Sequence, residues 1–119
     1  MSLVLVVEDD DGARRAMEDF LTDEGYDVVL ATDGRHAIEQ LAQHRPSVLL
    51  TDLEMARLDG EQLIAHAKAH HPELPIVVLT SCLVVDAQRE TERLGVFGYL
   101  NKPIELEALL AQVTMAIAG

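Results

Sequence analysis

Acidic residues follow two short apolar segments of this sequence. Residues 3–7 lead into Glu8 and Asp9, and residues 47–51 lead into Asp52. Carboxylate oxygens suit a hard cation such as Mg²⁺, and a cation offsets the repulsion that otherwise raises the pKa values of neighbouring carboxylates. An aspartate can also act as a nucleophile and become an acyl phosphate. If the fold brings them together, these three acids indicate metal-assisted phosphoryl chemistry.

A hydroxyl and an ammonium group follow two further apolar segments. Residues 76–79 lead into Thr80, and Lys102 comes shortly after residues 96–100. The only other lysine, Lys68, falls in a predicted helix. Phosphoryl transfer depends mainly on positioning and on neutralising charge. A carboxylate nucleophile, a metal ion, the Thr80 hydroxyl and the Lys102 ammonium form a complete set for that reaction.

These chemical groups stand at the ends of predicted strands. Short runs rich in β-branched and aliphatic residues predict strands at 3–7, 27–31, 47–51, 76–79 and 96–100. Apolar residues at helical spacing predict a helix after each strand, the last one over 104–117. Asp10 or Asp11 can cap the first helix, which is the alternative explanation for those two acids.

Alternation of this kind predicts an α/β fold with a parallel sheet and helices on both faces. We expect the flavodoxin-like doubly wound (βα)5 arrangement, a five-stranded sheet in the order 2-1-3-4-5. Ligands of such sheets bind at the carboxyl ends of the strands, where the strand order reverses. Strands 1 and 3 would deliver Glu8, Asp9 and Asp52 to that crevice.

Length and composition exclude several classes of protein. The 119 residues fit one domain, and 49% of them are hydrophobic, which is too many for a disordered acidic tail. The formal charge of −12 argues against direct binding of nucleic acid. No apolar run approaches a membrane span, and no secretory signal is visible. A single cysteine, Cys82, indicates a reducing compartment, so a cytoplasmic location is expected.

Five short segments together resemble the receiver domain of two-component response regulators, in particular the chemotaxis regulators, whose strand order is known to be 2-1-3-4-5. The resemblance covers almost the whole chain. No one segment is specific, but the five occur in order and at the separations of that family. They are VVEDD at 6–10, LTDLEM at 50–55, LDG at 58–60, LTS at 79–81 and YLNKP at 99–103.

The resemblance implies a role for each acid at the predicted sheet edge. Asp52 matches the phosphoacceptor. Asp9 matches a ligand of Mg²⁺ (or Mn²⁺), Glu8 assists, usually through water, and the backbone carbonyl of Glu54 completes the protein ligands. Glu54 and Cys82 also flank the route of attacking water and would modulate the lifetime of the phosphate. A redox role for Cys82 is an alternative, and a small apolar filler or exposed loop thiol is another.

The same resemblance implies a switch. Thr80 and Lys102 would bind the phosphoryl group, and Tyr99 matches an aromatic residue whose rotamer follows the movement of Thr80. The peptide bond between Lys102 and Pro103 is usually cis in this family. Phosphorylation would then shift the face formed by helix 4, strand 5 and helix 5.

The expected function is that of a phosphoacceptor in a two-component or phosphorelay system. The donor would be a phosphohistidine on a sensor histidine kinase or a histidine phosphotransfer protein. Apart from assisting its own phosphorylation and autodephosphorylation, the domain would not be an enzyme. Residues 1–119 would form a single receiver domain with no output domain, either acting alone or cut from a larger regulator. An output domain or effector protein is therefore a possible further partner, and no membrane partner is expected.

Two other functions stay open at this stage. One is a phosphatase with an aspartyl nucleophile, which the run from Asp52 to Glu54 faintly resembles. The other is a binding module that keeps the fold but is never phosphorylated.

Some positions depart from the family pattern. Ala56 replaces a usual proline, and Glu92 stands where a core leucine is usual. Residues 83–85 are apolar where small polar residues are common, and few apolar residues follow them, so the fourth helix is expected to be short, shifted or mobile. The alternative is that these three residues simply pack under the helix. His66 and His70 have the spacing of a helical zinc pair, but no third ligand is evident and surface positions are expected.

Overall fold

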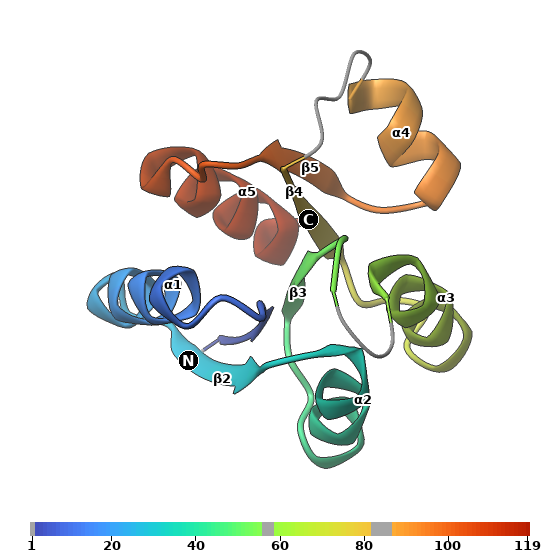
Figure 1. Ribbon diagram of the computed structural model, residues 1–119, viewed down its shortest axis with the longest axis horizontal. Coiled ribbons are helices and arrows are strands. Elements are labelled where there is room, and N and C mark those ends of the chain that lie inside the picture. Colours follow the sequence, from blue (N-terminus) through green and yellow to red (C-terminus); the bar gives the residue numbers. More distant parts are fainter. Residues whose placement is uncertain (1, 56–58, 82–86) are drawn as a thin grey trace.

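The computed structural model describes residues 2–55, 59–81 and 87–119. Strands and helices alternate along the chain, as Figure 1 shows. The strands are β1 (Leu3–Val7), β2 (Asp27–Ala31), β3 (Val48–Asp52), β4 (Ile76–Thr80) and β5 (Gly98–Asn101). The helices are α1 (Asp11–Asp23), α2 (Gly34–Gln43), α3 (Gly60–His70), α4 (Ala87–Leu94) and α5 (Leu106–Ala118).

The five strands form one parallel sheet in the order β2-β1-β3-β4-β5. The predicted fold class and strand order are therefore confirmed. The order reverses between β1 and β3, because β2 lies on one side of β1 and all later strands lie on the other. In the β1–β3 register Val7 pairs with Thr51, so the residues that follow these strands are neighbours.

Each face of the sheet has its own hydrophobic core. Side chains of β1 alternate between the two faces, with Val4 and Val6 in one cluster and Leu5 and Val7 in the other. The first cluster packs under α1 and α5, and the second packs under α2 and α3 (Figure 1). The three central strands β1, β3 and β4 are buried almost throughout, which explains their continuous apolar sequences.

Aspartates cap three helices and fix where these begin. Asp10 accepts a hydrogen bond from the Ala13 amide (2.7 Å), so the expectation that Asp10 or Asp11 caps α1 is confirmed for Asp10. Asp33 caps α2 in the same way. Asp59 and Gln62 form a reciprocal capping box at the start of α3. Each cap lies at the edge where the strands end, and so it helps to shape the loops of that edge.

Two predicted boundaries are wrong by two residues. Strand β5 begins at Gly98 and not at Val96, because the Val96 amide donates to Thr91 and closes the end of α4. Gly95 makes this reversal possible with a φ of 68°. Helix α5 begins at Leu106 and not at residue 104, since Glu105 still has extended backbone.

The described part of helix α4 spans eight residues and starts directly after residues that the structure does not describe, so the expectation that this helix is short, shifted or mobile stays a prediction. Glu92 is exposed on this helix, so the acid at the usual leucine position is not buried. Ala56, Cys82 and residues 83–85 lie outside the described residues. No described helix has both the length and the apolar character that a membrane crossing requires.

Candidate functional site

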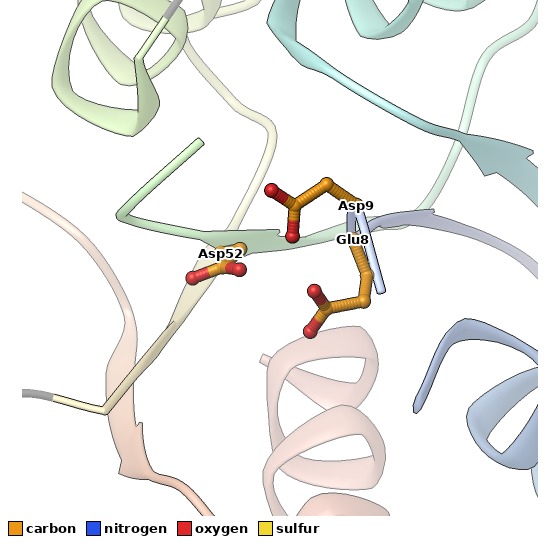
Figure 2. Close-up of side chains that lie close together, drawn as sticks. All are labelled: Glu8, Asp9 and Asp52. Carbon is orange, nitrogen blue, oxygen red and sulfur yellow. The ribbon is translucent and has the colours of Figure 1, made fainter. Parts of the chain in front are cut away.

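Three carboxylates meet at the point where the strand order reverses. Glu8 and Asp9 follow β1, and Asp52 ends β3. One oxygen of each carboxylate lies within 4.8 Å of an oxygen of the other two, and Figure 2 shows the three side chains converging. Glu8 is fully buried and Asp52 is 3% exposed, whereas Asp9 is exposed. The structure thus brings together the three acids that the sequence predicted.

Lys102 neutralises two of these acids. Its Nζ donates to Asp52 Oδ2 (2.8 Å) and lies 2.7 Å from Glu8 Oε1. The lysine amide donates to the carbonyl of Thr80 (2.7 Å), which ties the residue to the end of β4. Partial burial works against the charge of Lys102, but hydrogen bonds to Asp52 and Glu8 outweigh it and raise the lysine pKa. Lys102 is therefore held as a charged ammonium beside the two buried carboxylates.

Asp9 is the acid least compensated by the protein. Partial desolvation raises the pKa of its carboxyl group, and the neighbouring Glu8 raises it further. The attraction of Lys102 opposes this effect but does not cancel it. Because an added cation would favour the ionised form of Asp9, the electrostatics of the site fit a bound metal ion.

The donor set also fits a hard cation. Glu8, Asp9 and Asp52 offer only oxygen atoms, and three carboxylates face the single ammonium of Lys102. Magnesium prefers such ligands and takes only a few carboxylates, keeping waters for its remaining positions. Among the described residues, this is the one group of three or more potential ligands close enough to share an ion.

Backbone contacts hold Glu8 in place. The Asp10 amide donates to Glu8 Oε2 (3.1 Å), and Arg14 Nη1 donates to the Glu8 carbonyl (2.8 Å). Arg14 also forms an ion pair with Asp11. The sequence reasoning missed Arg14, whose helical position three residues after Asp11 is the only signal that could have indicated this contact.

The Thr80 hydroxyl lies at the predicted edge but has a partner that was not predicted. Thr80 is fully buried, and its Oγ1 donates to the carboxylate of Glu54, whose oxygens lie 2.8 and 2.9 Å away. Ser81 donates to the same carboxylate through its amide (3.1 Å) and its hydroxyl (3.0 Å). The Glu54 amide donates to Asp52 Oδ1 (3.3 Å). Ser81 was missed by the sequence reasoning, although its position after Thr80 was part of a matched segment.

Of the remaining predicted features, the structure describes Tyr99 and the peptide bond before Pro103 but not Cys82. Tyr99 is half-buried, pairs with Val78 in the sheet and packs against the second core cluster. The peptide bond between Lys102 and Pro103 is cis. Cys82 lies outside the described residues, so its predicted position beside Thr80 stays a prediction.

The helical histidine pair does not belong to this site. The rings of His66 and His70 lie 4.4 Å apart on α3. Partial desolvation lowers the pKa of His66, and the nearby His70 and His71 lower it further. No third ligand completes a zinc site there among the described residues.

Comparison with known proteins identifies the family. The model of the response regulator receiver domain matches residues 4–114, nearly the whole chain. This chain belongs to the receiver domains of response regulators. The DNA-binding transcriptional regulator NtrC of Escherichia coli (strain K12) is 34% identical over a region that covers 98% of this chain and 25% of that protein. The response regulator MprA of Mycobacterium leprae is 38% identical over 92% of this chain and 48% of its own length.

Solved structures agree with this family. The chemotaxis response regulator CheY4 of Vibrio cholerae superposes with a TM-score of 0.88 at 29% identity, covering 98% of both chains. The Francisella response regulator 1452 receiver domain superposes with a TM-score of 0.91 at 24% identity, and that likeness concerns the fold alone. This receiver domain spans only about a quarter to a half of the length of the curated relatives described above.

Proposed function

We propose that this receiver domain accepts a phosphoryl group on Asp52 from a phosphohistidine. The donor is a sensor histidine kinase or a histidine phosphotransfer protein, and the step is assisted by Mg²⁺ or Mn²⁺. The observation that carries the proposal is the contact of Lys102 Nζ with both Asp52 and Glu8, beside the carboxylate of Asp9. This arrangement supplies a nucleophile, a fixed cation and an oxygen-rich metal site at one sheet edge.

The transfer needs only the phosphohistidine and the carboxylate of Asp52 as reactants. A carboxylate oxygen of Asp52 forms a bond to phosphorus, the bond between phosphorus and the histidine nitrogen breaks, and the imidazole leaves with the electron pair and takes up a proton. When bound, the metal offsets the negative charge of the phosphoryl group. Asp9, Glu8, Asp52 and the Glu54 carbonyl would hold that metal.

The protein groups around Asp52 then stabilise the product. Lys102 is already charged and fixed at the nucleophile, so it can bind a phosphoryl oxygen without reorganisation. The Thr80 hydroxyl donates to another oxygen, and Tyr99 follows the movement of Thr80. As a result, the conformational equilibrium of the α4–β5–α5 face shifts towards its active form. Glu54 and Cys82 modulate the lifetime of the acyl phosphate.

The proposal extends to the partners and scope of the domain. Residues 1–119 act as one receiver domain, with an output domain or effector protein as the recipient of the signal. NtrC is described as a DNA-binding regulator, but the acidic charge of this chain makes the receiver itself unsuited to nucleic acid. We place the domain in the cytoplasm, and its own chemistry is limited to phosphorylation and autodephosphorylation.

A small phosphodonor tests this function directly. The receiver is incubated with acetyl phosphate and Mg²⁺, and the intact mass is measured. We expect one added phosphoryl group in the wild type and in the control Asp23→Asn, which alters an exposed acid at the end of α1. Asp52→Asn should take up none. An absence of adduct together with an absence of Mg²⁺ binding would reject the proposal, and steady release of phosphate from phosphoesters would favour a hydrolase.

A further inference from the structure

The carboxylate of Glu54 is bound by the groups that end β4. Both of its oxygens lie within 2.9 Å of Thr80 Oγ1, and Oε1 also accepts from the Ser81 amide and hydroxyl. One oxygen therefore receives hydrogen bonds from two residues. Charge-assisted hydrogen bonds of this kind are among the stronger ones in proteins.

The Thr80 hydroxyl is the donor that the proposed function assigns to a phosphoryl group on Asp52, and the Ser81 amide lies directly beside it. A carboxylate and a phosphoryl group are both anions that only accept hydrogen bonds. The Thr80 hydroxyl and the Ser81 amide each have a single hydrogen to donate. Thr80 is fully buried while its hydroxyl is held by Glu54, so a phosphoryl group has to take the place of the carboxylate to reach that donor. Glu54 and a phosphoryl group are therefore mutually exclusive at these donors.

The position of Glu54 makes the competition local to the phosphoacceptor. Its amide donates to Asp52 Oδ1, so its backbone is attached to the nucleophile while its side chain reaches the adjacent strand. Strands β3 and β4 are direct neighbours, and Asp52 pairs with Leu79, the residue before Thr80. The short tether keeps the effective concentration of this internal anion high.

We propose that the Glu54 carboxylate is an internal competitor that occupies the phosphoryl-binding donors of the unphosphorylated domain. Phosphorylation of Asp52 must expel this carboxylate, and Glu54 is exposed enough for its side chain to turn towards solvent. The inference rests on the proposed function. The free energy needed to displace the Glu54 carboxylate from Thr80 and Ser81 opposes phosphorylation of Asp52. A domain without this carboxylate should bind a phosphoryl group, or an analogue of one, more tightly.

The test uses beryllium trifluoride with Mg²⁺ as a phosphoryl analogue that binds without a chemical step. Affinity is measured by calorimetry for the wild type, Glu54→Gln and Glu54→Ala. Loss of a charge-assisted bond predicts about tenfold tighter binding for Glu54→Ala, with Glu54→Gln in between. The backbone carbonyl proposed as a metal ligand is present in all three proteins. Glu39→Gln is the matched control, because it removes the charge of an exposed glutamate on α2, away from the sheet edge, and should bind like the wild type.

A spectroscopic measurement on the wild type accompanies the affinities. The Ser81 amide resonance should move when the analogue binds, and it should move in Glu54→Ala before any ligand is added. Equal affinities in all variants, or weaker binding in Glu54→Ala, would overturn this inference while leaving the phosphoacceptor function standing. Failure of every protein to bind the analogue and to react with acetyl phosphate would instead overturn the proposed function.

Discussion

Replacing Lys102 by methionine removes the ammonium but keeps a side chain of similar length. The substitution leaves Glu8, fully buried, and Asp52, 3% exposed, without the cation that now lies 2.7 and 2.8 Å from them. Removing one partner of a buried ion pair costs about 3–5 kcal/mol. The Lys102 side chain is 24% exposed, so solvent screening reduces this, and we expect a loss of about 2–3 kcal/mol in unfolding free energy.

The expected loss is measurable by heat or by urea. For a domain of this size it corresponds to a fall of about 10 °C in Tm in the presence of a chelator. Magnesium should restore most of that stability, because a cation bound at the same carboxylates replaces the missing charge. A free Mg²⁺ concentration of a hundred times Kd contributes about 2.7 kcal/mol to the unfolding free energy. The pKa of Lys102 is raised in the folded protein, so its contribution to the unfolding free energy of the wild type is fully present below the ordinary lysine pKa of 10.5. This contribution is lost only as the pH rises past the raised pKa.

The second lysine of the chain provides a matched control. Lys68 donates to the Gly95 carbonyl (2.9 Å) at an exposed position, so Lys68→Met should cost less than about 1 kcal/mol and should not respond to Mg²⁺. If Lys102→Met were as stable as Lys68→Met in chelator, the buried carboxylates could not depend on Lys102. If Mg²⁺ failed to stabilise Lys102→Met, the metal would not bind at these acids. Either result would refute the reasoning.

Two further substitutions test the metal site and the loop behind it. Asp9→Asn should abolish Mg²⁺ binding, as measured by calorimetry, and should raise the Tm of the metal-free protein at neutral pH, because the raised pKa of Asp9 means that folding disfavours its charged form. This gain in Tm should vanish as the pH falls below the ordinary aspartate pKa of 3.8, where the carboxyl group is protonated in both the folded and the unfolded protein. A lower metal-free Tm at neutral pH would contradict this prediction. Gly60→Ala should cost about 1–3 kcal/mol in urea unfolding, since its Cβ would lie 2.5–2.7 Å from the backbone of Asp52 and Leu53. Gly12→Ala, whose Cβ would meet only a side-chain oxygen at 3.5 Å, should be neutral or stabilising, and equal losses at both glycines would exclude the proposed clash.

Much of the fold was accessible from the sequence because the strands are short and the three central ones are buried on both faces. Continuous apolar runs located β1 and β2 to the residue, and placed β3 and β4 within one residue. Parallel topology then placed the acids at one edge, since all strands of such a sheet end on the same side. Strand β5 was misplaced at its start because the backbone of Val96 serves the end of α4, which hydrophobicity alone does not reveal.

The side-chain partners at the site were less accessible. The sequence predicted that Glu8, Asp52 and Lys102 converge, because strand ends fix their backbones. It did not predict that Glu54 turns towards Thr80, since a glutamate has several rotatable bonds and the choice among its rotamers depends on donors from another strand. Local sequence spacing carries no information about such a contact between the loop after β3 and the end of β4.

Because the two faces of the sheet pack against separate cores, the length of a strand determines which face each residue after it points to. Val6 faces the core under α1 and α5, and Val7 faces the opposite core, so strand alternation sends Glu8 to the first side and Asp9 to the other. Adding or deleting one residue within β1 would exchange these directions and place apolar side chains on the wrong face at the same time. The number of residues in the strand is therefore as much a part of the site as the acids themselves, and changes in chain length are compatible with the chemistry only in the loops.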